Sequence, residues 1–376
     1  MFSFLQRSSR DALIRPLTME DRANLEAMIN TDPVAFLYAA EHLDLFGLPA
    51  SSAMPALRTS AGFMGIFEPT SDETTAPVAN AGLEPEQHRR QSGLSLSPRI
   101  KQIADIFLSP ISQARPSSSE LEDDGEEPLR SAAPISHVLV GAFWLGSNCV
   151  PLVIPDAYRA QVATVIARSS RTVASIFGAQ QDVLGLWELL APKMGKALSI
   201  RENQPLLYLP LDVSLERLAA QSLYRPDLEA PQVVAGGARW ARTSDRQSLL
   251  KASVAMFTEE VGYDPMSRDP VGYARRVDEF IRTGRSVVAT NDDGVVVFKA
   301  DLGLAHADVC QIQGVWLHPA YRGFGLSEPL LAQAFQLIRP RFPYISLYVN
   351  DFNTRARKLY AALGMSEENT FATILF

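Results

Sequence analysis

The fold of the second half of this chain follows from one stretch of sequence, Gln313-Gly-Val-Trp-Leu-His-Pro-Ala-Tyr-Arg-Gly-Phe-Gly-Leu-Ser-Glu328. The pattern predicts a strand that ends near Leu317, a short loop rich in arginine and glycine, and then a helix. Gly323 and Gly325 lack a Cβ, so the backbone of the loop can approach a ligand closely. Amides at a helix N-terminus, together with the helix dipole, suit a pyrophosphate. A Gly-x-Gly between a strand and a helix is, on its own, weak evidence for such a ligand.

A second pattern follows this stretch, Leu347-Tyr-Val-Asn350-Asp-x-Asn353-x-x-Ala356-x-x-Leu359-Tyr360-x-x-Leu-Gly364-Met365. With Val315-x-Leu317-x-Pro319-x-x-Arg322-x-x-Gly325-x-Ser327, it resembles the acyl-CoA motif and the following strand and helix of the GNAT superfamily of N-acetyltransferases. Order, spacing and residue types all agree. Ser327 departs from the usual glycine or alanine, but it is small enough to keep the backbone accessible. Met365 replaces a more common aromatic residue, a tolerable exchange in a core.

The resemblance covers residues 237–376. The wider chain is similar to a bacterial family in which such a C-terminal domain follows an N-terminal domain of unknown function. The segments that carry this closer similarity are Ser253-Val-Ala-Met-Phe-Thr-Glu-Glu-Val-Gly262, Val297-Phe-Lys-Ala300, Gln311-x-Gln-Gly-Val-Trp316 and Ser346-Leu-Tyr-Val-Asn-Asp-Phe-Asn353.

The resemblance implies an α/β (α+β) fold, with a mixed, twisted sheet flanked by helices. It also implies a transferase that moves an acetyl group from acetyl-CoA to a primary amine of a small molecule or a protein. The amine would attack directly in a ternary complex, with acetyl-CoA as the acyl donor and no metal.

The resemblance also places the cofactor. The backbone of a splayed strand is expected to meet the pantetheine arm, and the amides that follow are expected to hold the pyrophosphate. Trp316, between two cofactor-facing positions, is expected to point to the other face of the sheet. Arg322 either adds charge or braces the turn. The implied cofactor residues are Val315, Trp316, Leu317, Arg322, Gly323, Phe324, Gly325, Leu326, Ser327, Glu328 and Asn353.

The catalytic groups follow partly from the resemblance and partly from the chemistry. An attacking amine must lose a proton, and the departing thiolate must gain one. Tyr360 stands where superfamily members often place the acid, although a packed tyrosine would look the same in sequence. The strand before the loop lacks the usual carboxylate. Glu259 or Glu260, near the end of the first helix expected in this domain (residues 245–261), is therefore the candidate base, and His318 is a weaker one.

The rest of the chain divides by composition. Residues 1–50 are predicted to form the N-terminal helices of a first domain. Residues 51–136 are rich in Pro, Ser, Thr, Ala and Glu, a composition that predicts a disordered insertion. Residues 137–210 are expected to form the remainder of the first α/β domain, and residues 211–236 a linker. Residues 237–376 are expected to form the acetyltransferase domain.

Strands and helices alternate over residues 137–210, but no glycine loop for phosphate occurs there. This repetition is compatible with a degenerate copy of the C-terminal fold. Such a copy would either shape the acceptor cleft or mediate a homodimer.

Composition sets further expectations. The formal net charge of −7 and the pI near 5.4 argue against nucleic acid as a partner. Cys149 and Cys310 lie in apolar runs, as expected for buried thiols in a reducing compartment. The scattered histidines and the absence of a CxxC pair suggest no metal site. No apolar run is long enough for a membrane span, so we expect a cytoplasmic protein without a membrane partner.

Two other functions compete with acetyl transfer. A non-catalytic regulatory protein that binds acyl-CoA would explain the missing carboxylate on the strand. An aminoacyl transferase of the tandem-domain type, which uses charged tRNA, fits less well, because the chain is acidic and the CoA loop is intact.

Overall fold

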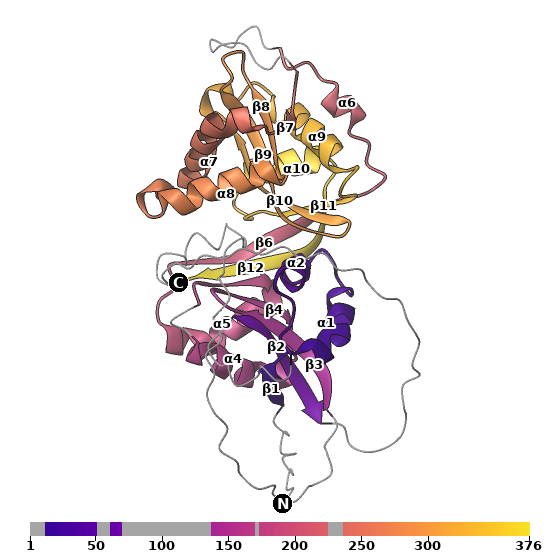
Figure 1. Cartoon of the computed structure of the whole chain (residues 1–376), viewed down its shortest axis with the longest axis vertical. Coiled ribbons are helices and arrows are strands. Elements are labelled where there is room, and N and C mark those ends of the chain that lie inside the picture. The colour runs from indigo at the N-terminus through magenta and orange to yellow at the C-terminus, as the bar shows by residue number, and fades with distance from the viewer. Residues whose placement is uncertain (1–11, 51–60, 70–136, 170–172, 225–235) are drawn as a thin grey trace, which may run out of the picture.

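The computed structural model describes residues 12–50, 61–69, 137–169, 173–224 and 236–376. It is a mixed α/β structure in which helices flank a large mixed sheet, as the sequence predicts (Figure 1). Among these residues, no helix is both long and apolar enough to cross a bilayer.

The N-terminal half, residues 12–219, alternates strands and helices. Its strands are β1 (Leu13–Pro16), β2 (Gly62–Pro69), β3 (His137–Leu145), β4 (Asn148–Val153), β5 (Ser175–Ala179) and β6 (Ser199–Leu209). Its helices are α1 (Arg22–Ile29), α2 (Leu37–Phe46), α4 (Arg159–Arg168), α5 (Gln180–Met194) and α6 (Glu216–Ala219).

The C-terminal half, residues 236–376, repeats nearly the same order. Its strands are β7 (Arg239–Trp240), β8 (Ser286–Thr290), β9 (Val296–His306), β10 (Val309–Leu317), β11 (Tyr344–Tyr348) and β12 (Ser366–Leu375). Its helices are α7 (Arg246–Val261), α8 (Pro270–Arg282), α9 (Ser327–Ile338) and α10 (Thr354–Ala362).

The strand order of the sheet is β1-β2-β3-β4-β5-β12-β6-β11-β10-β9-β8-β7. The order is symmetric about its centre: β1 to β6 of the N-terminal half occupy the places that β7 to β12 occupy when the sheet is followed from the opposite edge. The pairings agree as well. In each half the first four strands pair antiparallel, and the fourth and fifth pair parallel. The N-terminal half is therefore a second copy of the C-terminal fold.

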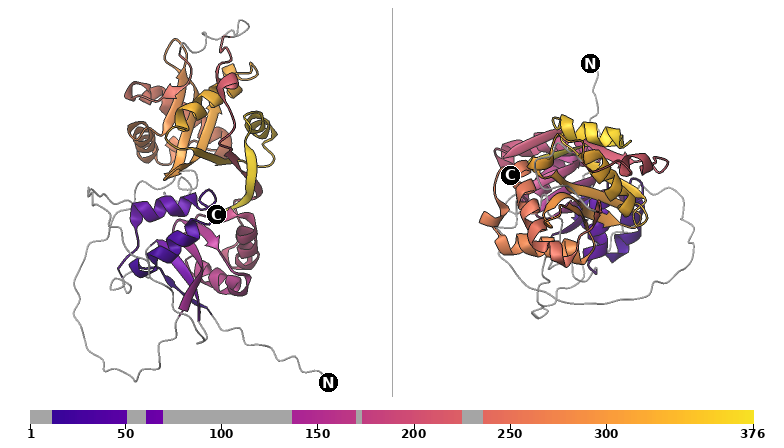
Figure 2. Two further views of the ribbon diagram at one scale, coloured as in Figure 1. Left: turned by 90° about the vertical axis from the view of Figure 1, so that its right-hand side faces the viewer. Right: turned by 90° about the horizontal axis from the view of Figure 1, so that it is seen from above.

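The last strand of each half lies in the sheet of the other half. β6 pairs antiparallel with β11, and β12 pairs antiparallel with β5. The two exchanged strands also pair with each other at the centre of the sheet. Figures 1 and 2 show them crossing between the halves. Each half therefore depends on the other to complete its sheet.

Equivalent helices cover equivalent faces. α1 and α2 pack on one face of the N-terminal sheet and α4 and α5 on the other. α7 and α8 correspond to the first pair, and α9 and α10 to the second. The tip of the β9–β10 hairpin packs against the N-terminal core through Leu304 and Val309. Glu41 on α2 forms an ion pair with Arg285 at 2.8 Å and accepts from the Ala305 amide at 3.2 Å, which joins the halves a second time.

The two copies also share an ion pair at the entry to their first helix. The Arg239 guanidinium donates twice to the Asp245 carboxylate, at 2.7 and 2.9 Å, and Asp245 also accepts from the Arg242 amide. Arg15 and Asp21 repeat the two bonds at the same distances. The hydrogen bonds from Arg239 lower the pKa of Asp245 and outweigh its burial.

The copies differ where the C-terminal half has its glycine loop. A short turn after β4, Asp156–Tyr158, leads straight into α4. The equivalent turn after β10, Pro319–Tyr321, is followed by residues 322–326 before α9 begins. The N-terminal copy therefore has the scaffold without this loop.

Two elements of the structure lie within segments that were expected from the sequence to be an insertion and a linker. Strand β2, at residues 62–69, lies inside the span predicted as a disordered insertion, because Phe63, Ile66 and Phe67 are buried apolar residues on an otherwise polar background. The remainder of that span, residues 51–60 and 70–136, lies outside the described residues. The predicted linker contains α6, which the Gln333 side chain on α9 contacts by donating to the Ala219 carbonyl at 2.8 Å.

We expect Asp245→Asn to destabilise the fold by about 2 kcal/mol, because it weakens a half-buried pair of charge-assisted hydrogen bonds. The loss should shrink as pH falls, because protonation of Asp245 breaks the pair in the wild-type protein too. Urea unfolding at several pH values measures both effects. The exposed Asp292→Asn serves as control, and equal stability of the two variants would contradict the assignment.

Candidate functional site

A β-bulge in β10 shapes the candidate site. Gln313 pairs with Asp301 and Trp316 with Lys299, so two residues of β10, Gly314 and Val315, oppose one residue of β9. Gly314 has a φ of +56°, the left-handed conformation that glycine adopts without strain. The bulge turns the end of β10 away from its regular path.

Lys299 supports the bulge from below. Its side chain is completely buried and forms an ion pair with Asp301. The ammonium also donates to the Gly314 carbonyl at 3.0 Å. The Ser286 hydroxyl donates to Asp301 at 2.7 Å, so both members of the buried pair have further hydrogen bonds.

A cleft opens where β10 parts from β11. The two strands pair only as far as Gln311 and Ser346, and beyond this point residues 312–317 and 347–350 line opposite sides of a cavity of about 740 Å³. The cavity extends to the N-terminus of α9 and along α10. The size and position suit a ligand of tens of atoms that reaches from the bulge to the glycine loop.

The loop before α9 has the predicted form. Gly323 and Gly325 have φ angles of +88° and +67°, and both line the cavity with Ser327 and Glu328. The residue before the helix, Leu326, offers no side-chain cap to the first-turn amides of α9. This is the geometry in which a helix N-terminus attracts an anion.

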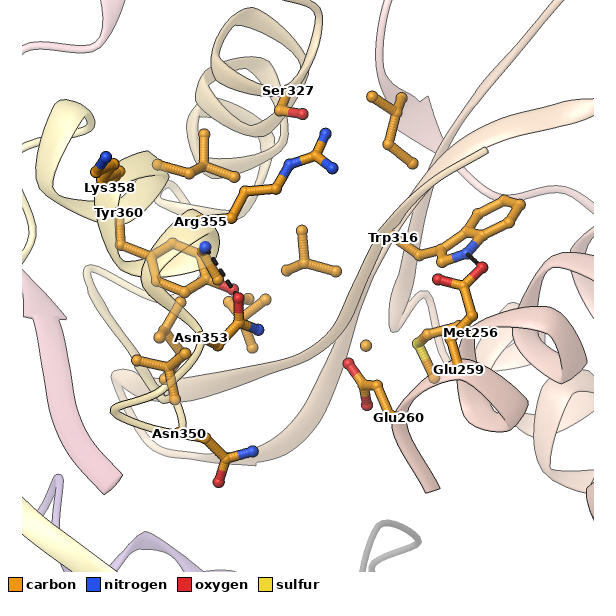
Figure 3. Close-up of a pocket in the computed structure, with 18 of the residues that line it drawn as sticks. Met256, Glu259, Glu260, Trp316, Ser327, Asn350, Asn353, Arg355, Lys358 and Tyr360 are labelled. Atoms are coloured by element: carbon orange, nitrogen blue, oxygen red, sulfur yellow. Dashed lines mark hydrogen bonds between the residues drawn. The ribbon is translucent and has the colours of Figure 1, made fainter. Parts of the chain in front are cut away.

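Glu259 and Arg322 clamp this loop to α7. The Arg322 guanidinium donates to both carboxylate oxygens of Glu259, at 3.0 and 2.7 Å, and its Nε donates to the Leu317 carbonyl at 2.8 Å. The Trp316 indole also donates to Glu259, at 3.3 Å (Figure 3). Arg322 thus braces the turn, and the Glu259 carboxylate already has three hydrogen bonds.

Glu260 is placed differently from its neighbour. Its side chain projects from α7 into the cavity, toward the side where α10 lies (Figure 3). The surrounding protein raises the pKa of Glu260 by desolvation, although Lys299 and Arg201 lower it and Glu259 raises it further. The raised pKa makes this carboxylate a stronger base than an ordinary exposed glutamate.

Tyr360 and Asn353 line the opposite wall. Tyr360 is 8% exposed, and burial together with the charge of Glu260 raises its pKa. Its hydroxyl therefore stays protonated at neutral pH. The Asn353 side chain accepts from the Ala356 amide at 3.1 Å and caps α10 (Figure 3). Arg355 lies on the same wall and points toward Ser327.

The cavity brings together most of the residues predicted from the sequence. Phe324 and Leu326 are not among the residues that line it, and Leu326 packs in the core beneath α9. Trp316 packs against Phe257 and its neighbours, as predicted, but its edge also reaches the cavity. His318 is outside the lining, and its Nδ1 accepts from the Ala320 amide, so it is a poor candidate base. The predicted residues that line the cavity are Val315, Trp316, Leu317, Arg322, Gly323, Gly325, Ser327, Glu328, Asn353, Glu259, Glu260 and Tyr360.

The site also contains residues that were not assigned to it from sequence, and four of them shape it most directly. Gly314 lies in the bulge, Lys299 donates to its carbonyl, and Arg201 and Gln204 reach the cavity from β6. The sequence contained a signal for Lys299 and Gly314. A lysine inside an apolar strand suggests a buried contact, and a lone glycine inside a strand suggests a bulge. Nothing in the sequence pattern marks Arg201 or Gln204. Within the described residues, no group of acidic, histidine or cysteine side chains suits a metal ion.

Comparison with known proteins agrees with this geometry. Residues 252–365 match the acetyltransferase (GNAT) family, and the chain therefore contains a domain of that family at its C-terminus. Residues 132–221 match a domain of unknown function, DUF4081. The occurrence of these two domains in this order confirms the family resemblance seen in the sequence. No curated protein matches the chain significantly.

Solved structures show similarity at low identity. A tandem GNAT protein from the clavulanic acid biosynthesis pathway is 14% identical, with a TM-score of 0.41, over 96% of this chain and 98% of its own. An acetyltransferase of the GNAT family from Colwellia psychrerythraea is 11% identical, with a TM-score of 0.41, over 64% of this chain and 82% of its own. A GCN5-related N-acetyltransferase from Kribbella flavida is 17% identical, with a TM-score of 0.39, over 63% and 88%.

We expect Gly314→Ala to damage the cleft. A Cβ there would lie 2.7 Å from the Met256 sulfur and 2.9 Å from the Lys299 ammonium, and its φ would be strained. Strain of about 1–3 kcal/mol should make the bulge relax and so lower the affinity of the cleft for CoA, the ligand expected from the sequence. Isothermal titration with CoA measures the affinity. Gly62→Ala, where a Cβ meets nothing within 4 Å, is the matched control, and equal affinity in both variants would contradict a role for the bulge.

Proposed function

We propose that the C-terminal half transfers an acetyl group from acetyl-CoA to a primary amine. One observation carries the proposal: a strand splayed by a glycine bulge leads directly into a glycine loop at a helix N-terminus, along one continuous cavity. The match of residues 252–365 to the acetyltransferase (GNAT) family supports it.

The donor would lie along this cavity. Its pyrophosphate would accept hydrogen bonds from the amides of residues 323–328, where the α9 dipole favours negative charge. Pantetheine would run between β10 and β11, where the strands no longer pair with each other and backbone groups near Val315 face the cavity. Asn353 and Arg355 lie along the α10 side of the same path.

The proton transfers can be assigned to two side chains. Glu260 accepts a proton from the acceptor ammonium, so that the neutral amine attacks the thioester carbon and forms the C–N bond. Amides of the bulged strand would stabilise the oxygen of the tetrahedral intermediate. As the C–S bond breaks, Tyr360 donates its proton to the leaving sulfur, and the amine nitrogen passes its second proton through solvent to the tyrosinate that remains, so that Glu260 holds the one proton released overall. Glu259 is a weaker candidate for the base because Arg322 and Trp316 engage it.

Titration of the protein with acetyl-CoA, followed by measurement of thiol release over a library of primary amines, tests the proposal. Binding together with thiol release that depends on an amine supports a transferase. Binding without release for any amine would favour a non-catalytic acyl-CoA-binding protein, and absence of binding would contradict both.

Replacement of Glu260 by Gln should lower kcat/KM by about 100-fold or more, the usual contribution of a positioned base. The wild-type rate should fall as pH decreases, with a midpoint above the ordinary glutamate pKa, because desolvation raises the pKa of Glu260. The variant should lose this acidic limb. Glu259→Gln is the control, expected to keep the limb and to raise the KM for acetyl-CoA by loosening Arg322. Loss of the limb in Glu259→Gln instead would reverse the two assignments.

Tyr360→Phe should lower kcat by about 100-fold with little change in acetyl-CoA affinity, because only the hydroxyl proton is removed. Rates measured with an activated thioester, whose leaving thiol is more acidic, should depend less on this residue. Tyr344→Phe, at an exposed position at the start of β11, is the control. An unchanged kcat for Tyr360→Phe would show that the tyrosine only packs.

A further inference from the structure

The exchanged strand β6 brings two polar residues of the N-terminal half into the cleft of the C-terminal half. Arg201 and Gln204 both line the cavity, together with Glu260 from α7 and Tyr348 from β11. The cleft is therefore incomplete without the N-terminal half. Gln204 contacts Asn350 at the end of β11, and Arg201 lies near Glu260 and Tyr348. We take this part of the cavity, next to the candidate base Glu260, as the place where an acceptor would meet the thioester.

A bulge in β6 makes this possible. Gln204 pairs with Phe371 and Arg201 with Thr373, so two residues of β6 oppose a single residue of β12. In a regular strand, positions three apart face opposite sides of the sheet. The extra residue turns Arg201 to the same face as Gln204, a use of bulges that is common near functional sites.

Gln204 holds this part of the strand in place. Its side chain is buried, and it donates to Asn350 at 2.9 Å and accepts from the Thr373 hydroxyl at 2.6 Å. It thereby joins β6 both to β12 and to the loop after β11. The position of Arg201, three residues earlier, is accordingly set by the sheet itself.

Arg201 on β6 and Glu260 on α7 carry opposite charges and both line this part of the cavity. The guanidinium lies near enough to Glu260 and to Tyr348 for its charge to lower the pKa of each, against the larger effect of burial. Arg201 is half-buried, and Glu260 is open to the cavity. A charged pair presented in this way complements a ligand that carries both an ammonium and an anion.

We propose that the acceptor is an amine that also bears a carboxylate, with Arg201 binding the carboxylate and Glu260 the reacting ammonium. This inference rests on the proposed transfer reaction and specifies its substrate class. The planar guanidinium matches a carboxylate with two parallel hydrogen bonds. A diamine would instead bring its second ammonium toward Arg201 and be repelled. An amine without a second charge would gain nothing from Arg201.

A binding experiment with matched ligands tests the substrate class. The full-length protein, saturated with CoA, is titrated with free amino acids and ω-amino acids and with the carboxamide of each. We expect the carboxylate member of at least one pair to bind about 10- to 100-fold more tightly, the contribution of hydrogen bonds to a charged group. The preference should vanish in Arg201→Met. It should persist in part in Arg201→Lys, which keeps the positive charge but cannot donate two parallel hydrogen bonds to a carboxylate.

Arg168→Met, on the exposed face of α4, removes the same charge away from the cleft and should retain the full preference. Binding of CoA itself should be unchanged in all three variants, which shows that the fold and the donor site are intact. If carboxamides or diamines bind as tightly as the amino acids, or if no amino acid binds, the inference is overturned. The same holds if Arg201→Met retains the preference.

Turnover separates this inference from the reaction on which it rests. A carboxylate preference in binding without thiol release from acetyl-CoA would support the acceptor site and contradict acetyl transfer. Thiol release with carboxamides or diamines at rates equal to those with amino acids would support acetyl transfer and overturn the acceptor class.

Discussion

The exchange of β6 and β12 is the constraint on which the rest of the structure depends. A strand at the edge of a sheet leaves a row of backbone donors and acceptors unpaired. Here β5 and β11 would be such edges, and each is covered by the last strand of the other half. The backbone hydrogen bonds at the centre of the sheet therefore belong to both halves at once. A ligand cleft that begins beside β11 must then include residues of β6, and the N-terminal half becomes part of the site without keeping a glycine loop of its own.

The contacts outside the sheet reinforce this arrangement. Glu41 is buried at the junction, where it has both Arg285 and the Ala305 amide as partners. Desolvation raises the pKa of Glu41, and the nearby arginine opposes this. His306 adds a more exposed pair with Asp44 at 2.7 Å. Because the β9–β10 hairpin is held at its tip by the N-terminal core and carries the bulge near its other end, the orientation of the bulge is tied to the packing between the halves.

The sequence alone predicted the C-terminal half well, since its elements have strong local signals. The glycines around Phe324 permit a positive φ, and the buried strands form apolar runs. It did not predict strand exchange, because β6 and β12 read as ordinary strands and only the pairing partner differs. It missed β2 because a strand of eight residues stands alone within a long stretch of biased composition. Arg201 was missed for a related reason: its side-chain direction depends on a bulge in the pairing with β12, and a pairing of distant segments leaves no local pattern.

The bulge in β10 and the bulge in β6 both shape the cleft, the first by diverting a strand and the second by orienting Arg201. A regular sheet would continue the pairing of β10 with β11 and leave no room for a ligand. The bulge at Gly314 diverts one strand, and the buried Lys299 satisfies the carbonyl that the diversion frees. That ammonium, paired with Asp301, also lowers the pKa of Glu260, which burial raises. Lys299, which supports the bulge, thus also helps to set the pKa of Glu260 in the cleft. On the opposite side, the bulge in β6 contributes a second cation, Arg201, from the other half of the chain. The shape and the charge of the cleft around Glu260 both follow from these two irregularities in the sheet.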